Sequence, residues 1–214
     1  MDMQQLKSLI RQGEGTQIEF KKTLTHLPKV AKTLAAFANN RGGTILVGVE
    51  DNRSICGVNP DEESFMVMQA ARDWCFPPID LALVEEEVEG ATVLLVQVAE
   101  SSKKPHQARN KANEWITYVR ADDKCIVADQ NLEKQIKALP PADEREEKLV
   151  FSKNEQAVFS LLKSGKKFTL KEYAKSINIG KQRATKILVE LVKEGILFEK
   201  QEGKSLVYLA AVNI

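Results

Sequence analysis

The chain has 214 residues, 31 of them basic and 30 acidic, so the formal net charge is +1, and 43% of the residues are hydrophobic. A disordered chain has fewer apolar residues and a larger net charge, and a collagen or low-complexity chain has far more than 11 Gly and 7 Pro. The longest apolar runs are the length of a β-strand, and no hydrophobic block follows a basic one near the start. We therefore expect a folded cytoplasmic protein with no membrane segment and no secretory signal.

The three cysteines, Cys56, Cys75 and Cys125, are widely spaced, odd in number and outside any CxxC pair. Only His26 and His106 could join them as nitrogen ligands, so a structural zinc site would need an unusual ligand set. We expect neither a disulfide framework nor a resident metal or cofactor.

An acidic stretch with a Pro pair, PPADEREEKL at residues 140–149, separates two parts of different charge. Residues 1–140 carry 17 basic and 20 acidic side chains, whereas residues 150–214 carry 12 and 6. Because such a stretch buries little surface and its prolines break a helix, we interpret it as a linker. The expected domains are 1–139 and 150–214. A charge difference of this size is also common between small domains and need not reflect a function.

The first part reads as an α+β domain with a mixed sheet. A helix after Pro28 has its alanines and Leu34 at helical spacing and ends at Gly42-Gly43, and an apolar strand over residues 44–49 follows. This strand is apolar on both faces, which is typical of a central strand. The other expected elements are strands at 17–20, 54–58 and 115–119, helices at 61–74 and 129–138, and a hairpin of 81–88 and 91–98.

The second part reads as three helices followed by a hairpin. Two capping-box sequences, Ser152–Glu155 and Thr169–Glu172, each open an apolar periodic run. A third helix is expected over about residues 181–194, and strands at 196–200 and 205–209 flank a turn. This order predicts a small winged helix-turn-helix domain.

In a winged helix the third helix enters the DNA major groove, so its polar N-terminal residues are candidate contacts to duplex DNA. The candidates are Lys181, Gln182, Arg183, Thr185 and Lys186, with Lys204 at the hairpin tip as the wing contact. One alternative is an ordinary solvated helix face. The other is a protein-docking module, because some winged helices bind proteins and not DNA.

Four motifs in the first part occur in a characteristic order: Ile18-Glu-Phe-Lys21, the run Ala35–Asp51 (AAFANNRGGTILVGVED), Ile55-Cys-Gly-Val58 and Tyr118-Val-Arg120. Together they resemble the Schlafen-type AlbA-like domain, which in bacteria is commonly followed by a winged helix. The resemblance implies nucleic-acid binding and a role in transcriptional regulation.

Three further basic residues, Lys21, Lys22 and Arg120, are candidate phosphate contacts in the first domain. The two lysines could equally protect an edge strand, and Arg120 could pair with Asp122 or Asp123. The basic stretch Ser101–Lys111 is expected to be a mobile loop.

The resemblance also raises an enzymatic alternative, because two glutamates and an aspartate form a metal-dependent ribonuclease site in the animal Schlafen branch. Glu14, Glu19 and Asp51 are the matching positions here and could bind Mg²⁺ or Mn²⁺. Three exposed acids near strand ends are more common than a nuclease, and the Cys/His set of the animal domain is missing from this sequence. We therefore expect no catalytic residues.

The sequence thus favours a homodimeric, non-enzymatic transcriptional regulator that binds duplex DNA. A Schlafen-type ribonuclease and a nucleotide- or ligand-sensing regulator are the alternatives. The aromatic residues of the first domain, such as Phe65, Trp74 and Phe76, are expected in the core, and the sequence leaves open whether Trp115 or Tyr118 is exposed.

Overall fold

The computed structural model describes residues 3–139, 150–165 and 167–212. The chain divides into two compact units, unit 1 (Met1–Val127) and unit 2 (Ala128–Ile214). The expected linker at 140–149 lies outside the described residues. Within the described ranges, no helix is both long and apolar enough to cross a membrane.

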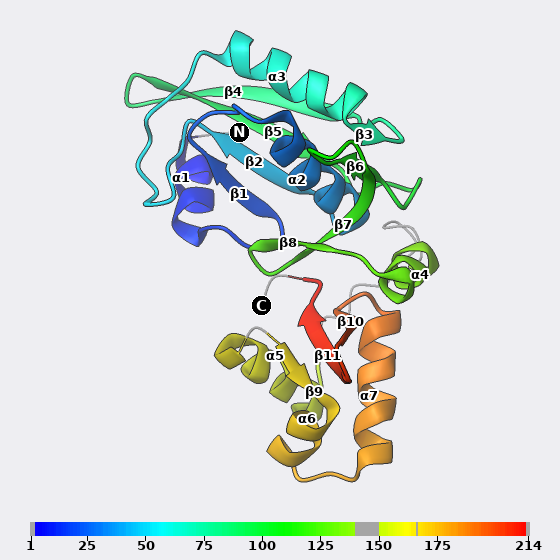
Figure 1. Cartoon of the computed structure of the whole chain (residues 1–214). Helices are drawn as coiled ribbons and strands as arrows, with labels where there is room; N and C mark the ends of the chain where they lie inside the picture. Colours follow the sequence, from blue (N-terminus) through cyan, green and yellow to red (C-terminus); the bar gives the residue numbers. More distant parts are fainter. Residues whose placement is uncertain (1–2, 140–149, 166, 213–214) are drawn as a thin grey trace. The chain divides into compact units, whose positions relative to one another are not determined.

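Unit 1 has the expected mixed α+β architecture, built on two sheets (Figure 1). One has the order β1-β2-β5-β4, with β1 parallel to β2 and the other pairs antiparallel, and the second, antiparallel sheet has the order β3-β6-β7-β8. The helices are α1 (Met3–Gln12), α2 (Leu27–Asn39) and α3 (Pro60–Asp73). The strands are β1 (Ile18–Lys21), β2 (Gly43–Val47), β3 (Cys75–Phe76), β4 (Leu81–Val88), β5 (Ala91–Val98), β6 (Gln107–Arg109), β7 (Trp115–Ala121) and β8 (Lys124–Val127).

Most predicted elements of unit 1 are confirmed, including α2, α3, β2 and the β4–β5 hairpin. Helix α1 and strands β3, β6 and β8 are additional. The partner strand expected at 54–58 is reduced to a single bridge between Val49 and Ile55. The stretch expected as a mobile loop contains β6, and the Lys104 ammonium in it is nearly buried and paired with Glu100.

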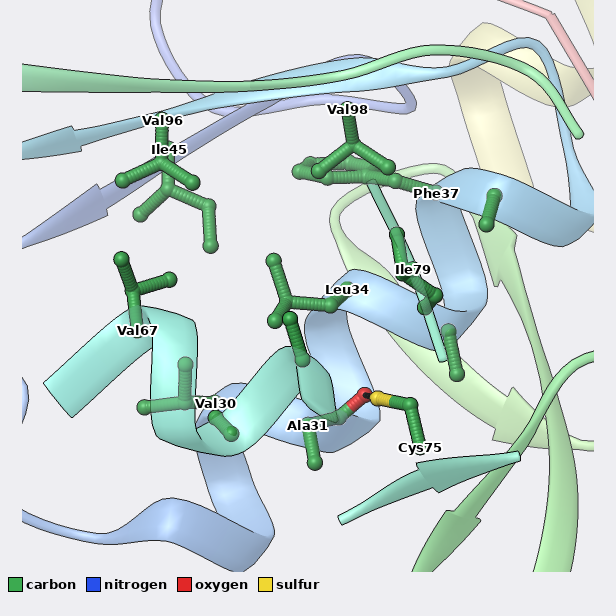
Figure 2. Packing of buried hydrophobic residues seen from close by; sticks show 14 of the residues in the cluster. Val30, Ala31, Leu34, Phe37, Ile45, Val67, Cys75, Ile79, Val96 and Val98 are labelled. Atoms are coloured by element: carbon green, nitrogen blue, oxygen red, sulfur yellow. Dashed lines mark hydrogen bonds between the residues drawn. The ribbon is translucent and has the colours of Figure 1, made fainter. Parts of the chain in front are cut away.

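Helix α2 is buried all round from Thr33 to Asn39, where its sequence is mostly apolar, whereas Lys29 near its start is exposed. Its residues share one hydrophobic cluster with α3, with Ile45 and Val96 of the first sheet and with Ala108 of the second. Figure 2 shows Phe37 of α2 beneath Val98, and Leu34 in the middle of the cluster. The same helix therefore packs against both sheets.

Strand β2 is covered on both faces, as its sequence predicted. Ile45 and Val47 belong to the cluster around α2, whereas Leu46 belongs to a second cluster with Leu6 and Ile10 of α1. Because successive side chains of a strand point to opposite faces, the run of apolar residues fills two cores at once.

The glycine pair after α2 is required by close packing. Gly42 has φ +70°, and a Cβ there would lie 2.5 Å from the carbonyl oxygen of Val98. A Cβ on Gly43 would lie 2.6 Å from the Phe37 ring. Close packing and the positive φ of Gly42 are therefore sufficient to explain the glycine pair.

Two buried amides at the end of α2 join the helix to the second sheet. The Asn39 side chain donates to the carbonyl oxygens of His106 (2.7 Å) and Tyr118 (2.8 Å) and accepts from the His106 amide (2.6 Å). The Asn40 side chain donates to the carbonyl oxygen of Arg120 (3.1 Å). Asn39 and Asn40, which belong to the motif Ala35–Asp51, thus satisfy backbone groups that burial would otherwise leave unpaired.

Unit 2 contains the order of elements expected from its sequence, preceded by one more helix. Its elements are α4 (Gln130–Ala138), α5 (Lys153–Gly165), β9 (Lys167–Thr169), α6 (Leu170–Ser176), α7 (Lys181–Lys193), β10 (Leu197–Glu202) and β11 (Ser205–Ala210). The three strands form an antiparallel sheet in the order β10-β11-β9. Both capping boxes are present: Ser152 and Glu155 bond reciprocally before α5, and Thr169 and Glu172 do so at α6.

Helix α4, which the sequence analysis assigned to the first domain, groups with unit 2. The Gln135 side chain donates to the carbonyl oxygen of Glu199 (2.7 Å) and accepts from the Glu199 amide (3.0 Å). Because β10 is an edge strand, this amide pairs with backbone groups in the way a further strand would.

His106 is a buried neutral imidazole. Nδ1 lies 2.8 Å from the carbonyl oxygen of Pro77, which can only accept, so Nδ1 carries the proton and Nε2 accepts from the Ser101 hydroxyl (2.7 Å). Burial lowers the pKa of His106, and the nearby Lys103 and Lys104 charges add to that effect.

We predict that His106 makes unit 1 less stable in acid. Its pKa in the folded state is lower than the unfolded value of about 6.5, so the unfolded state binds more protons between these two values. The stabilisation is complete above about pH 6.5 and is lost as the pH falls through the folded pKa. In urea unfolding from about pH 7.5 to about pH 5, the unfolding free energy of the wild type should fall more than that of His106→Gln. A difference between the two proteins that does not change with pH would contradict the prediction.

Candidate nucleic-acid interface

The predicted DNA-contacting residues of unit 2 lie at the exposed start of α7. Lys181, Gln182, Arg183 and Lys186 are exposed, while Ala184, Leu188 and Leu191 on the other side of the helix are buried. The helix begins after Gly180, which offers no side-chain cap, and its first turn contains no acidic residue. Free amide groups, the positive end of the helix dipole and two cations, Lys181 and Arg183, therefore coincide at this turn, and Lys186 follows in the next.

The two other predicted contacts of unit 2 differ in availability. Thr185 is half-buried, and its hydroxyl donates back to the carbonyl oxygen of Lys181 (2.9 Å). Lys204 is exposed in the turn between β10 and β11, next to Gly203, whose φ is +58°. The hairpin tip thus presents a cation, whereas Thr185 would have to exchange its internal bond for a base contact.

Lys21 and Lys22, at the end of β1, are engaged in ion pairs. The Lys21 ammonium lies 2.5 Å from the Glu19 carboxylate and donates to the carbonyl oxygen of Phe20 (2.7 Å). The Lys22 ammonium lies 2.8 Å from Glu50, and this hydrogen bond lowers the pKa of the Glu50 carboxyl. Both lysines retain exposed surface, but each already has an anionic partner.

Arg120 is 1% exposed and binds within the protein. Its guanidinium lies 2.6 Å from the Glu19 carboxylate and donates to the carbonyl oxygens of Gly15 (2.8 Å) and Ile18 (3.2 Å). It also lies over the Phe37 ring, 5.3 Å from the centroid. Arg120 has no surface left to contact a phosphate, so its prediction as a nucleic-acid contact is wrong. Its acidic partner is Glu19 and not the neighbouring Asp122 or Asp123.

The three acids of the ribonuclease alternative are not arranged as a metal site. Glu14 accepts a hydrogen bond from the Phe20 amide (2.8 Å), Glu19 is bonded by both Arg120 and Lys21, and Asp51 is exposed in a turn. Across the described parts of the chain, no three His, Cys, Asp or Glu side chains form a group that could hold a metal ion. A divalent cation at Glu19 would have to displace two cationic side chains, so these residues do not fit the metal.

A small cavity of about 170 Å³ lies beside the start of α2 and was not expected from the sequence. Lys21, His26 and Lys29 contribute its basic groups, and Leu24 and Ile45 contribute apolar lining. The His26 side chain makes no capping bond, and the first turn of α2 contains no acid. The cavity could therefore accept a small anionic group.

Three aromatic side chains expected in the core or left undecided are exposed. Phe65, expected in the core, is 69% exposed on the outer side of α3, so that expectation is wrong. Phe76 is 61% and Trp115 43% exposed, and their ring centroids lie 6.0 Å apart. The sequence gives one indication for Phe76, which follows the end of α3 and directly precedes two prolines.

Residues 14–129, more than half of the chain, match the family described as Schlafen, AlbA_2. The chain belongs to the Schlafen AlbA_2 family. The matched range of the Schlafen AlbA_2 domain runs from Glu14 through β8 to the residue before α4, so it coincides with most of unit 1.

Individual relatives cover parts of the chain. An uncharacterized ATP-binding protein, UU034 of Ureaplasma parvum, is 46% identical over 52 residues, which are 23% of this chain and 15% of that protein. Two solved structures are similar: the DIP2311 protein of Corynebacterium diphtheriae (TM-score 0.43, 19% identity, 61% of this chain and 31% of that one) and the N-terminal domain of an ATP-dependent DNA helicase RecG-related protein of Nitrosomonas europaea (TM-score 0.41, 24% identity, 49% and 80%). The chain thus spans only a small part of UU034 and about a third of DIP2311.

We predict that Arg120 stabilises the fold. Arg120→Ala leaves the Glu19 carboxylate and two carbonyl oxygens without their buried partner, which should lower the unfolding free energy by about 3–5 kcal/mol in urea titrations. Arg72→Ala is the control, because Arg72 pairs with Asp73 on the surface, where water screens the charges, and its loss should cost much less. Similar small losses for both variants would contradict the structural role of Arg120.

Proposed function

We propose that this Schlafen AlbA_2 protein is a DNA-binding transcriptional regulator whose unit 2 is a winged helix-turn-helix that docks on duplex DNA. The order α5-β9-α6-α7-β10-β11, with α7 as the recognition helix and the β10–β11 hairpin as the wing, supports this assignment. The main support is the start of α7, where Lys181, Arg183 and Lys186 are exposed beside an uncapped helix end.

The chemistry of this turn suits both parts of DNA recognition. Lys and Arg neutralise phosphates, and the free amides at the helix start add a further anion site. Arg183 and Gln182 carry side chains that read guanine and adenine edges in the major groove. Lys204 on the wing would hold a neighbouring phosphate.

We further propose that the protein binds DNA as a homodimer. One recognition helix and one wing make few phosphate contacts, and pairing two half-sites is the usual way to gain affinity and specificity. The expected complex contains two chains on one duplex.

The test is a gel shift on duplex DNA at several salt concentrations. A Lys181→Ala/Arg183→Ala/Lys186→Ala variant should lose most of its affinity, about 10³-fold or more at moderate salt, and should bind with a shallower salt dependence because three phosphate contacts are missing. Its thermal unfolding should stay close to that of the wild type, since all three side chains are exposed.

A matched control removes three other exposed cations of unit 2, Lys153, Lys163 and Lys193, and should change affinity much less. Equal loss in both variants would mean that only the net charge of unit 2 matters, and unchanged affinity in the first variant would refute α7 as the recognition helix. A complex of one chain per duplex would refute the dimer.

A nucleotide-sensing role is the second candidate, supported by the cavity at the start of α2 and by the description of the Ureaplasma relative as an ATP-binding protein. In this role Lys29 would meet phosphate oxygens, and Lys21 would do so after leaving Glu19. Leu24, Val30 and Ile45 would contact an apolar part of the ligand. ATP bound here would change the DNA affinity of the chain.

Isothermal titration with ATP, with and without Mg²⁺, tests this role. We expect binding that weakens at least tenfold in Lys29→Ala and is unchanged in Lys32→Ala, a lysine of the same helix that lies over the Tyr118 ring instead. No heat of binding in the wild type, or the same loss in both variants, would exclude the cavity as a nucleotide site.

A further inference from the structure

Unit 1 carries an exposed aromatic pair at one end of its second sheet. Phe76 lies on β3 and Trp115 on β7, two strands that are labelled in Figure 1. Their ring centroids are 6.0 Å apart at an interplanar angle of 58°. With 61% and 43% of their surfaces exposed, both rings offer large apolar area to the solvent. Nothing in the core of unit 1 requires aromatic side chains at these two exposed positions.

The register of the sheet places both rings on its outer face. Phe76 is opposite Gln107 on β6, and Trp115 is opposite Arg109 on the same strand. Between these two rows lie Cys75 and Ala108, which are buried in the cluster around α2. Since side chains alternate along a strand, the aromatic rows face away from the core.

The surroundings of the pair are polar and carry cations. The Arg109 guanidinium lies over the Trp74 ring, 5.6 Å from its centroid, and Lys111 is exposed two residues farther along the chain. Of the nearby acids, Asp73 is paired with Arg72 (2.8 Å), and Glu114 accepts a hydrogen bond from Asn110 (2.8 Å). A partner with an anionic backbone and flat apolar groups would suit this combination.

We propose that this surface, Phe76 and Trp115 with Arg109 and Lys111, binds single-stranded nucleic acid by stacking unpaired bases on the two rings. Sheets that display aromatic side chains next to Arg or Lys bind single strands in this way, because each base has a stacking face and each phosphate a charge. The bases of a duplex are stacked on one another and cannot meet the rings. The site is therefore separate from α7 and goes beyond the duplex-binding function.

A protein partner fits the surface less well. The two rings are bordered by Gln107, Arg109 and Lys111, whereas the centre of a protein interface is depleted in charged residues other than Arg. Docking of a second copy of the chain is retained as an outcome of the test.

The experiment measures binding of the full chain to labelled oligothymidylate and oligouridylate by fluorescence anisotropy, and follows quenching of tryptophan fluorescence. Phe76→Ala/Trp115→Ala should weaken binding at least tenfold. Phe65→Ala is the matched control, because Phe65 is a 69% exposed aromatic on α3, outside the pair, and its loss should leave affinity unchanged. Trp115→Phe keeps a stacking face and should bind nearly as well as the wild type, whereas Trp115→Leu should not.

The Lys181→Ala/Arg183→Ala/Lys186→Ala variant separates this proposal from the duplex-binding function, since it should keep its affinity for single strands. Loss of single-strand binding in that variant, no binding by the wild type at low salt, or equal binding by the Phe76/Trp115 double variant would each overturn the proposal. So would a double variant that changes only self-association in sedimentation, which would make the surface a contact between copies. If the double variant does not fold, the comparison of Trp115→Phe with Trp115→Leu decides.

Discussion

The buried guanidinium of Arg120 joins the two sheets of unit 1. It comes from β7 of one sheet and meets Glu19 on β1 of the other, together with the carbonyl oxygens of Gly15 and Ile18. Burial lowers the pKa of Arg120, but Glu19 and the Cys125 sulfur together raise it by more, so the guanidinium stays charged. Phe37 lies under the guanidinium, and Gly43 leaves room for that ring. The surroundings of this ion pair thus connect three of the motifs that are typical of the family: Ile18–Lys21, Ala35–Asp51 and Tyr118–Arg120.

The sequence predicted the regular elements well where local signals set them. The capping boxes at Ser152 and Thr169, the apolar run of β2 and the Glu89-Gly90 turn of the β4–β5 hairpin each fix a boundary through nearby residues, and the structure contains all of them. Strands β3 and β6 were missed because they are only two and three residues long and are defined by pairing with each other across the sheet. Helix α4 was assigned to the wrong unit because only a contact with β10, 64 residues away, shows where it packs.

The same difference between local signals and long-range contacts applies to the candidate sites. The exposed start of α7 follows from helical periodicity, so the positions of Lys181, Arg183 and Lys186 could be predicted from the sequence. The burial of Arg120 could not, because its partners lie more than 100 residues earlier in the chain. The exposure of Phe76 and Trp115 likewise depends on which end of the second sheet remains uncovered, and composition favours a core position for any aromatic residue.

The contact between Gln135 and Glu199 affects how unit 2 can be isolated. A fragment that starts at residue 150, after the acidic stretch, would lack α4 and leave the outer backbone groups of β10 open to strands of other molecules. Such a fragment would be prone to aggregate, and its DNA binding would be measured on a mixture. A fragment that starts at Ala128 keeps the edge covered and is the natural form in which to study this half of the protein.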